Sequence, residues 1–169
     1  MHKFLKHLDR ILAVFLMILM AAIVVDVTWQ VLSRFIVSNP SSVTEEIARF
    51  LLVWIGLLGA AYAFRTHAHL GLDLFTSKLP MEKRIWAELV SQLVSFLFSA
   101  VVMVYGGVKL VSLQLALGQT SAALQVKMGY VYIVIPLAGV LICLYAVDNM
   151  LSVRERLAEA EHNRQLNDA

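Results

Sequence analysis

Residues 11–25 read ILAVFLMILMAAIVV, without a polar side chain, and the apolar pattern continues through DVTWQVLSRFIV to residue 37. A membrane-spanning helix needs about 20 mostly apolar residues, so residues 11–37 predict a first span. Lys3, Lys6 and Arg10 precede this stretch, as basic residues precede the core of a secretory signal peptide. The stretch is too long for such a core, and no small-residue cleavage pattern follows it. We therefore interpret it as a retained helix.

Working outward, three further apolar stretches meet the length of a span. They predict helices over residues 47–64, 85–117 and 128–153. The connecting segments are residues 38–46, 65–84 and 118–127, and the tails are residues 1–10 and 154–169. Residues 1–10 and part of 65–84 are amphipathic, as expected of short helices that lie in the membrane interface. The predicted fold is an all-α integral membrane protein with four transmembrane helices.

The composition agrees with a chain surrounded by lipid. Of its 169 residues, 60% are hydrophobic and 15% are charged, whereas a soluble domain is about 45–50% apolar and about 25% charged. The net charge of +2 is small and its basic residues lie near membrane edges, so nucleic acid is not an expected partner. The single cysteine, Cys143, excludes an intrachain disulfide and a cysteine-based zinc cluster.

The distribution of basic residues predicts the orientation. Lys and Arg are concentrated in the two tails and in residues 65–84, whereas residues 38–46 have none and residues 118–127 have only Lys127. Since Lys and Arg accumulate in cytoplasmic segments, both termini are expected in the cytoplasm.

No residue pattern points to catalysis. The predicted spans contain no histidine that could hold a haem, and the chain has no HExxH, GxSxG or phosphate-loop motif. His67 and His69 have no third ligand beside them, so a metal site is not expected. The sequence thus predicts neither an enzyme nor a bound cofactor.

Polar residues inside the first span form one stripe. Asp26, Gln30 and Arg34 are spaced four residues apart and therefore share a helix face. The stripe is either an ion relay or a polar seam against protein. A seam is favoured, because a transport path usually takes polar groups from several helices.

Acidic and basic residues flank the next connection. Glu45 precedes Arg49 by four residues, in the favourable order for a helical ion pair. Arg34 lies just across the turn from Glu45 and Glu46. These side chains either pair locally or contact a neighbouring protein, so Arg34, Glu45, Glu46 and Arg49 are candidate docking or subunit-interface residues.

Small residues repeat along two predicted spans. Lipid provides no hydrophobic drive for helices to associate. Association depends instead on the close backbone packing that small residues allow. The stripes are packing surfaces, within the chain or toward a partner, and comprise Gly56, Gly59, Ala60, Ala63, Ser91, Ser95 and Ser99.

Several short motifs lie in the first half of the chain. They are residues 30–35 (QVLSRF) followed by Pro40, residues 45–54 (EEIARFLLVW), and Gly59, Arg65 and residues 69–73 (HLGLD), which include His69 and Asp73. Together these motifs resemble the small membrane subunit of tripartite ATP-independent periplasmic (TRAP) transporters. Spans three and four agree with that family mainly in length and placement.

The resemblance implies a scaffold role. Such a subunit braces a large elevator-type membrane subunit, which holds the sodium sites, and helps to dock a periplasmic substrate-binding protein. The implied activity is sodium-coupled uptake of an organic acid, such as a dicarboxylate or sialic acid. Two alternatives stay open at this point: an autonomous oligomeric four-helix transporter that uses Asp26 for coupling, and an anchoring protein unrelated to transport.

Overall fold

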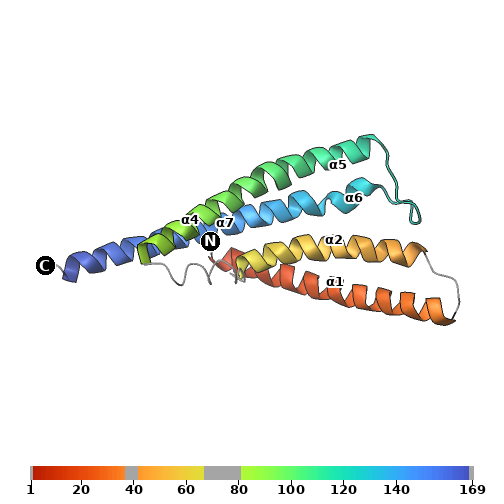
Figure 1. Cartoon of the computed structure of the whole chain (residues 1–169), viewed down its shortest axis with the longest axis horizontal. Helices are drawn as coiled ribbons and strands as arrows, with labels where there is room; N and C mark the ends of the chain where they lie inside the picture. Colours follow the sequence, from red (N-terminus) through yellow and green to blue (C-terminus); the bar gives the residue numbers. More distant parts are fainter. Residues whose placement is uncertain (1, 37–41, 67–80, 168–169) are drawn as a thin grey trace.

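The computed structural model describes the backbone of residues 2–36, 42–66 and 81–167, and the side chains of residues 5–36, 42–66 and 86–152. Almost all of these residues are helical (Figure 1). The helices are α1 (His2–Ile36), α2 (Ser42–Arg65), α4 (Met81–Phe98), the π-helical η1 (Ser99–Gly106), α5 (Gly107–Ala116), α6 (Met128–Tyr132) and α7 (Val134–Asn167).

Within the residues that the structure describes, four helical segments are long and apolar enough to cross a membrane, which confirms the predicted fold class. They are Leu5–Ile36, Ser42–Arg65, Trp86–Ala116 and Met128–Ser152. The third consists of α4, η1 and α5 in direct succession, and the fourth joins α6 to most of the apolar part of α7.

The ends of the spans differ in detail from the predicted segments. The amphipathic segment expected at residues 1–10 forms the first turns of α1, where Leu5 is buried in the core together with Leu12. The polar tail expected from residue 154 continues α7 to Asn167. The interfacial helix expected within residues 65–84 lies largely outside the described residues.

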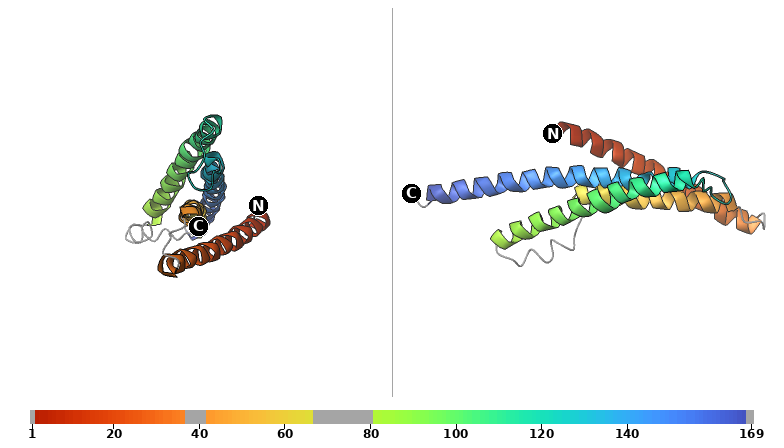
Figure 2. Two further views of the ribbon diagram at one scale, coloured as in Figure 1. Left: turned by 90° about the vertical axis from the view of Figure 1, so that its right-hand side faces the viewer. Right: turned by 90° about the horizontal axis from the view of Figure 1, so that it is seen from above.

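The helices form an open arrangement in which α2 and α7 lie between α1 and the α4–α5 span (Figures 1 and 2). Helix α7 packs against α2 on one side and against α4 and η1 on the other, while α1 packs on α2. The end of α1, the start of α2 and residues 117–127 lie at one end of the molecule, called the loop end here. The opposite end, where α1 begins and α2 finishes, is called the terminal end.

The core lies where α1, α2 and α7 meet. Its members on α7 at positions 134, 138, 141 and 145 are spaced three or four residues apart, so they share one face of that helix, and Ala146 lies next to the last of them. The buried residues are Leu5, Leu12, Leu58, Ala61, Phe64, Val134, Ala138, Leu141, Tyr145 and Ala146.

Proline explains the break between α6 and α7. A proline inside a helix lacks the N–H that would bond to the carbonyl four residues earlier, and its ring crowds that carbonyl. For Pro136 that carbonyl belongs to Tyr132, the last residue of α6. Helix α6 therefore ends at Tyr132, and α7 begins at Val134, after Ile133.

Candidate functional site

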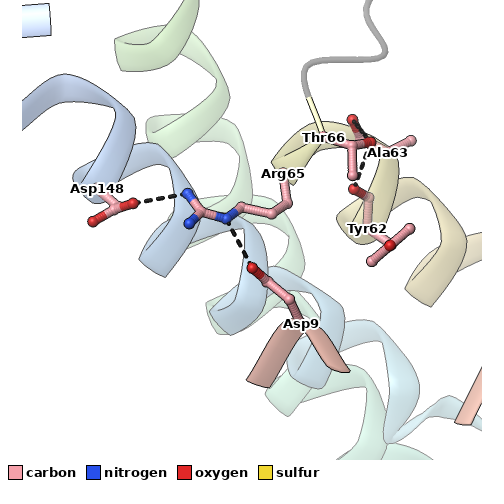
Figure 3. A network of polar contacts seen from close by, with 6 residues as sticks. All are labelled: Asp9, Tyr62, Ala63, Arg65, Thr66 and Asp148. Carbon is pink, nitrogen blue, oxygen red and sulfur yellow. Dashed lines mark hydrogen bonds and ion pairs between the residues drawn. The ribbon is translucent and has the colours of Figure 1, made fainter. Parts of the chain in front are cut away.

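Three helices meet at a charged cluster near the terminal end, formed by Asp9, Arg65, Tyr145 and Asp148. The Arg65 guanidinium donates from Nε to Asp9 Oδ2 at 3.2 Å and from one terminal nitrogen to Asp148 Oδ2 at 2.7 Å (Figure 3). Its Cζ lies 5.5 Å from the centre of the fully buried Tyr145 ring. The side chains of Arg65 and Asp148 are 17% and 6% exposed.

This terminal-end cluster ties α1, α2 and α7 together. One guanidinium, which has five N–H donors in a fixed fork, reaches two carboxylates on different helices. Since a charge removed from water needs a hydrogen-bonded partner, each member depends on the others. The cluster, called the clamp below, therefore holds the three helices together at this end.

Sequence reasoning placed Arg65 in the family motif but missed Asp9 and Asp148. Arg65 is 56 residues from Asp9 and 83 residues from Asp148, so no spacing rule joins them. The available signal was an acidic residue at the end of each of two apolar stretches, on the same side as Arg65. His69 and Asp73, the other motif residues of that segment, lie outside the described residues.

A second polar cluster, at the loop end, is formed by Glu46 and residues 118–127. The Glu46 carboxylate accepts hydrogen bonds from the backbone N–H groups of Ala122, Ala123 and Leu124, at 3.2, 3.0 and 2.8 Å. A carboxylate with several N–H donors is strongly held, because the bonds are charge-assisted. Glu46, expected to be a docking or interface residue, thus fastens the start of α2 to the α5–α6 loop.

The predicted polar seam joins α1 to α2. The Gln30 side-chain amide donates to Asp26 Oδ2 at 2.7 Å and to the backbone carbonyl of Thr44 at 3.0 Å. Asp26 and Gln30 thus lie side by side on α1. Both side chains are half-buried.

The remaining charged candidates have separate environments. Arg49 forms an ion pair with Glu45 one helical turn away, and both side chains are largely exposed. Arg34 is exposed near the end of α1. Because Glu45 is paired with Arg49 and Glu46 is held by the loop, neither acid forms an ion pair with Arg34 in the described structure.

The small-residue stripes divide into packed and open positions. A Cβ added at Gly56 or Gly59 would meet no heavy atom within 4 Å, so this face of α2 is open. Ala60 is exposed on the same helix, whereas Ser99 is fully buried. The half-buried positions are Ala63, Ser91 and Ser95.

The close helix contacts within the chain use glycines that the stripes did not include. A Cβ at Gly139 of α7 would lie 2.7 Å from Met103 Cβ of η1, and one at Gly129 of α6 would lie 2.5 Å from Leu115 Cγ of α5. One at Gly107 would lie 3.0 Å from side-chain atoms of Ile135 and Pro136. Isolated glycines in apolar helices were the signal that could have identified them.

No metal cluster is found in the part of the chain that the structure describes. It contains no group of three or more His, Cys, Asp or Glu residues that could hold a metal. An open apolar groove of about 340 Å³ lies between the α4–η1 segment and α7 and is lined by residues such as Phe96, Val104 and Cys143.

Comparison with known proteins gives the same family along most of the chain. Residues 23–156 match the family model described as the DctQ component of tripartite ATP-independent periplasmic transporters. The chain is 33% identical over 85 residues to the sialic acid TRAP transporter small permease protein SiaQ of Vibrio cholerae, an alignment that covers 50% of this chain and 47% of that protein. It is 31% identical over 99 residues to the C4-dicarboxylate TRAP transporter small permease protein DctQ of Rhodobacter capsulatus, covering 59% and 43%.

A third relative is much longer. The isethionate TRAP transporter permease protein DctMQ of Oleidesulfovibrio alaskensis is 30% identical over 130 residues, covering 73% of this chain and 20% of that protein. The chain thus spans less than half the length of each of these three relatives. All are transporter permease proteins rather than enzymes, as the sequence predicted. The match over residues 23–156 and the four apolar helices identify this chain as a multi-pass membrane protein that belongs to the DctQ component family of TRAP transporters.

Proposed function

We propose that this chain is the small scaffold subunit of a TRAP-type secondary transporter. It braces a large elevator-type membrane subunit and helps to dock a periplasmic substrate-binding protein during sodium-coupled uptake of an organic acid. The proposed substrate class is a dicarboxylate, a sialic acid or a related anion.

The observation that carries this proposal is the large apolar surface that the described helices leave uncovered. In the most apolar 18-residue stretch of α1, only 6% of the residues are buried. Large side chains such as Ile11, Val25 and Phe35 are exposed on it. Exposed apolar helix faces of this extent mark contact with lipid or with another membrane protein. A bundle that is open in this way, with Arg65 and Glu46 held by contacts between its own helices and loop, fits a brace better than a transport path.

The large partner is proposed from the open faces together with the third relative. In that isethionate permease protein, the region similar to this chain is one-fifth of the whole. A helix of a large subunit packed on the Gly56 face would gain the close backbone approach that stabilises helix pairs in lipid. Surfaces left over would face membrane lipids.

Orientation is part of the proposal. Both termini lie in the cytoplasm and the chain spans the bacterial inner membrane, in accord with the basic residues at the tails. The loop end then faces the periplasm, where the binding protein docks, and Arg34 contributes to that docking. Sodium ions bind in the large subunit, and this chain holds no cofactor.

Copurification and reconstitution test this function. We expect adjacent genes to encode a large polytopic subunit and a secreted binding protein, and the tagged chain to copurify with the large subunit in a one-to-one complex. Proteoliposomes should take up labelled sialic acid, succinate or isethionate only when both membrane subunits, the binding protein and a sodium gradient are present. Uptake driven by the small chain alone would overturn the proposal in favour of an autonomous transporter.

A further inference from the structure

The α5–α6 loop has a defined conformation that several internal contacts maintain. The backbone N–H of Ser121 donates to the Val126 carbonyl at 2.9 Å, and the Met128 N–H donates to the Gln119 carbonyl at 2.9 Å. Gly118 and Gln125 both have positive φ angles, 61° and 54°, which give the chain its sharp turns. The loop is therefore a closed hairpin-like structure.

Residues 122–124, at the tip of this loop, make no such backbone pairing with the rest of it. Instead their three N–H groups converge on one carboxylate, that of Glu46 on α2. Successive N–H groups of this kind form an anion-binding concavity. Here an acidic side chain of the same protein occupies it, 76 to 78 residues away in sequence.

A chain of hydrogen bonds extends this fastening to α1. Gln30 on α1 bonds to the Thr44 carbonyl on α2, two residues before Glu46. The end of α1, the start of α2 and the α5–α6 loop are thus held relative to one another, although they belong to separate parts of the sequence (Figure 1).

In the described part of the chain, the same contacts leave two cations without an acidic partner at the loop end. Glu46 remains a carboxylate, but both of its oxygens accept bonds from the loop N–H groups, and Glu45 is paired with Arg49. Arg34 and Lys127 are exposed and form no ion pair within the described residues. Exposed apolar side chains, including Phe35 and Val126, accompany them. A surface with free cations and apolar groups is complementary to a partner with an acidic patch around apolar residues.

We propose that Glu46 is a positioning residue that holds the α5–α6 loop in place, so that Lys127 on the loop and Arg34 on α1 together receive an acidic patch of a water-soluble protein. This inference rests on the proposed function, which supplies the soluble protein as the periplasmic binding protein. The inference adds to the proposed function the α5–α6 loop, Lys127 as a second cation, and Glu46 as the residue that fixes their geometry. A preformed surface reduces the ordering cost of association, so the loop needs its fastening before the partner arrives.

Hydrogen–deuterium exchange on the purified two-subunit complex tests the fastening without any partner. In Glu46→Gln the side chain loses its charge and gains an N–H₂ group that faces other N–H donors. The amides of residues 122–124 should then exchange at least about tenfold faster, since a charge-assisted bond is roughly twice as strong as a neutral one. The matched control, Glu45→Gln, should leave exchange in this loop unchanged. Unchanged exchange in Glu46→Gln would show that Glu46 does not hold the α5–α6 loop in place.

Titration of uptake with the binding protein tests the docking surface. Lys127→Glu should raise the binding-protein concentration for half-maximal uptake about tenfold and leave the maximal rate near that of the unmodified protein, because charges at the edge of an interface act mainly on association. Glu46→Gln should shift the same concentration in the same direction. The control Lys6→Glu reverses an exposed lysine at the terminal end, and it should behave as the unmodified protein does.

Ionic strength supplies a separate readout. Raising salt should weaken docking of the unmodified complex and affect Lys127→Glu much less, because the screened attraction is already lost. An unaltered titration of Lys127→Glu, in a system whose unmodified form requires the binding protein, would overturn this inference alone. Uptake that needs neither the binding protein nor this chain would overturn the proposed function instead.

Discussion

Arg65 and Arg49 are both arginines of α2 that pair with acidic side chains, but their surroundings differ. Arg49 and its partner Glu45 are 70% and 62% exposed, whereas Arg65 is 17% exposed and contacts two acids. An exposed pair gains little, because solvent screens it and two long side chains lose freedom. Breaking a buried pair leaves an uncompensated charge.

Replacing Arg65 should therefore destabilise the protein. Arg65→Ala leaves Asp9 and Asp148 without their cation, at a cost of about 3 kcal/mol, toward the low end for a buried pair because Arg65 keeps some exposure. Thermal unfolding of the purified membrane complex should show a markedly lower midpoint. Arg49→Ala is the control and should unfold close to the unmodified protein.

Adding Asp148→Asn to Arg65→Ala tests whether the loss comes from unpaired charge. The double variant should be more stable than Arg65→Ala alone, since one orphaned carboxylate has been removed. Equal effects of Arg65→Ala and Arg49→Ala would contradict the clamp.

Asp26 should not be a coupling carboxylate. It accepts a hydrogen bond from Gln30, which also holds α2 through the Thr44 carbonyl, and an asparagine oxygen can accept the same bond. We expect Asp26→Asn to retain sodium-driven uptake in the complete system. Loss of uptake in a complex that assembles normally would instead favour an ion relay along α1.

Arg34 should act in docking. It is exposed at the loop end, and the nearby acids have other partners. Arg34→Glu should impair uptake at low binding-protein concentration while the two membrane subunits still copurify, with Arg34→Ala milder, because reversal adds repulsion. Loss of copurification would assign Arg34 to the subunit interface. Unchanged uptake would show that Arg34 has no role in docking and only extends its side chain to the membrane surface.

At the scale of elements, close packing and open surface lie on different helices. Gly139 of α7 lies against η1, where an added Cβ would come within 3.2 Å of the Val104 backbone nitrogen as well as close to Met103. Gly56 of α2 faces open space. The first glycine serves packing within the chain, and the second is available to a partner.

Alanine at these two glycines should have opposite outcomes. Gly139→Ala must displace backbone and Cβ atoms of η1, so overpacking of about 1–3 kcal/mol should exceed any gain in helix propensity. Gly56→Ala meets no atom of this chain and should leave its unfolding unchanged or slightly improved. Thermal unfolding of the isolated small subunit compares the two. A stability loss in Gly56→Ala that equals that of Gly139→Ala would contradict the assignment.

At the scale of the whole molecule, an even number of spans places the start of α1 and the end of the fourth span on one side of the membrane. The concentration of Lys and Arg in the tails predicts that this side is the cytoplasmic one. Green fluorescent protein fused after residue 169 should therefore fluoresce in cells, and alkaline phosphatase fused within residues 118–127 should be active. The reverse pair of results would invert the orientation, and with it the proposed docking side.

The local parts of the candidate site were accessible from sequence because helical periodicity brings residues four apart together. This is why Asp26 lies beside Gln30 and Glu45 beside Arg49. The bonds from Glu46 to the α5–α6 loop and from Arg65 to two other helices cross between distant segments, and no periodic pattern encodes them.

Sequence alone determined that this chain is a four-span helical membrane protein of the TRAP small-subunit type. An apolar stretch long enough to cross a bilayer must satisfy its own backbone in a helix, so length and hydropathy suffice for the four spans. The family type followed instead from the resemblance carried by residues 30–35, 45–54 and 69–73. Only the tertiary structure decided which helices touch, which glycines pack and which charges meet. Lipid surrounds every apolar face equally well, so hydropathy does not distinguish a face packed on α7 from one left open. That distinction depends on shape and on the contacts of Asp9, Arg65 and Asp148, which exist once the helices have assembled.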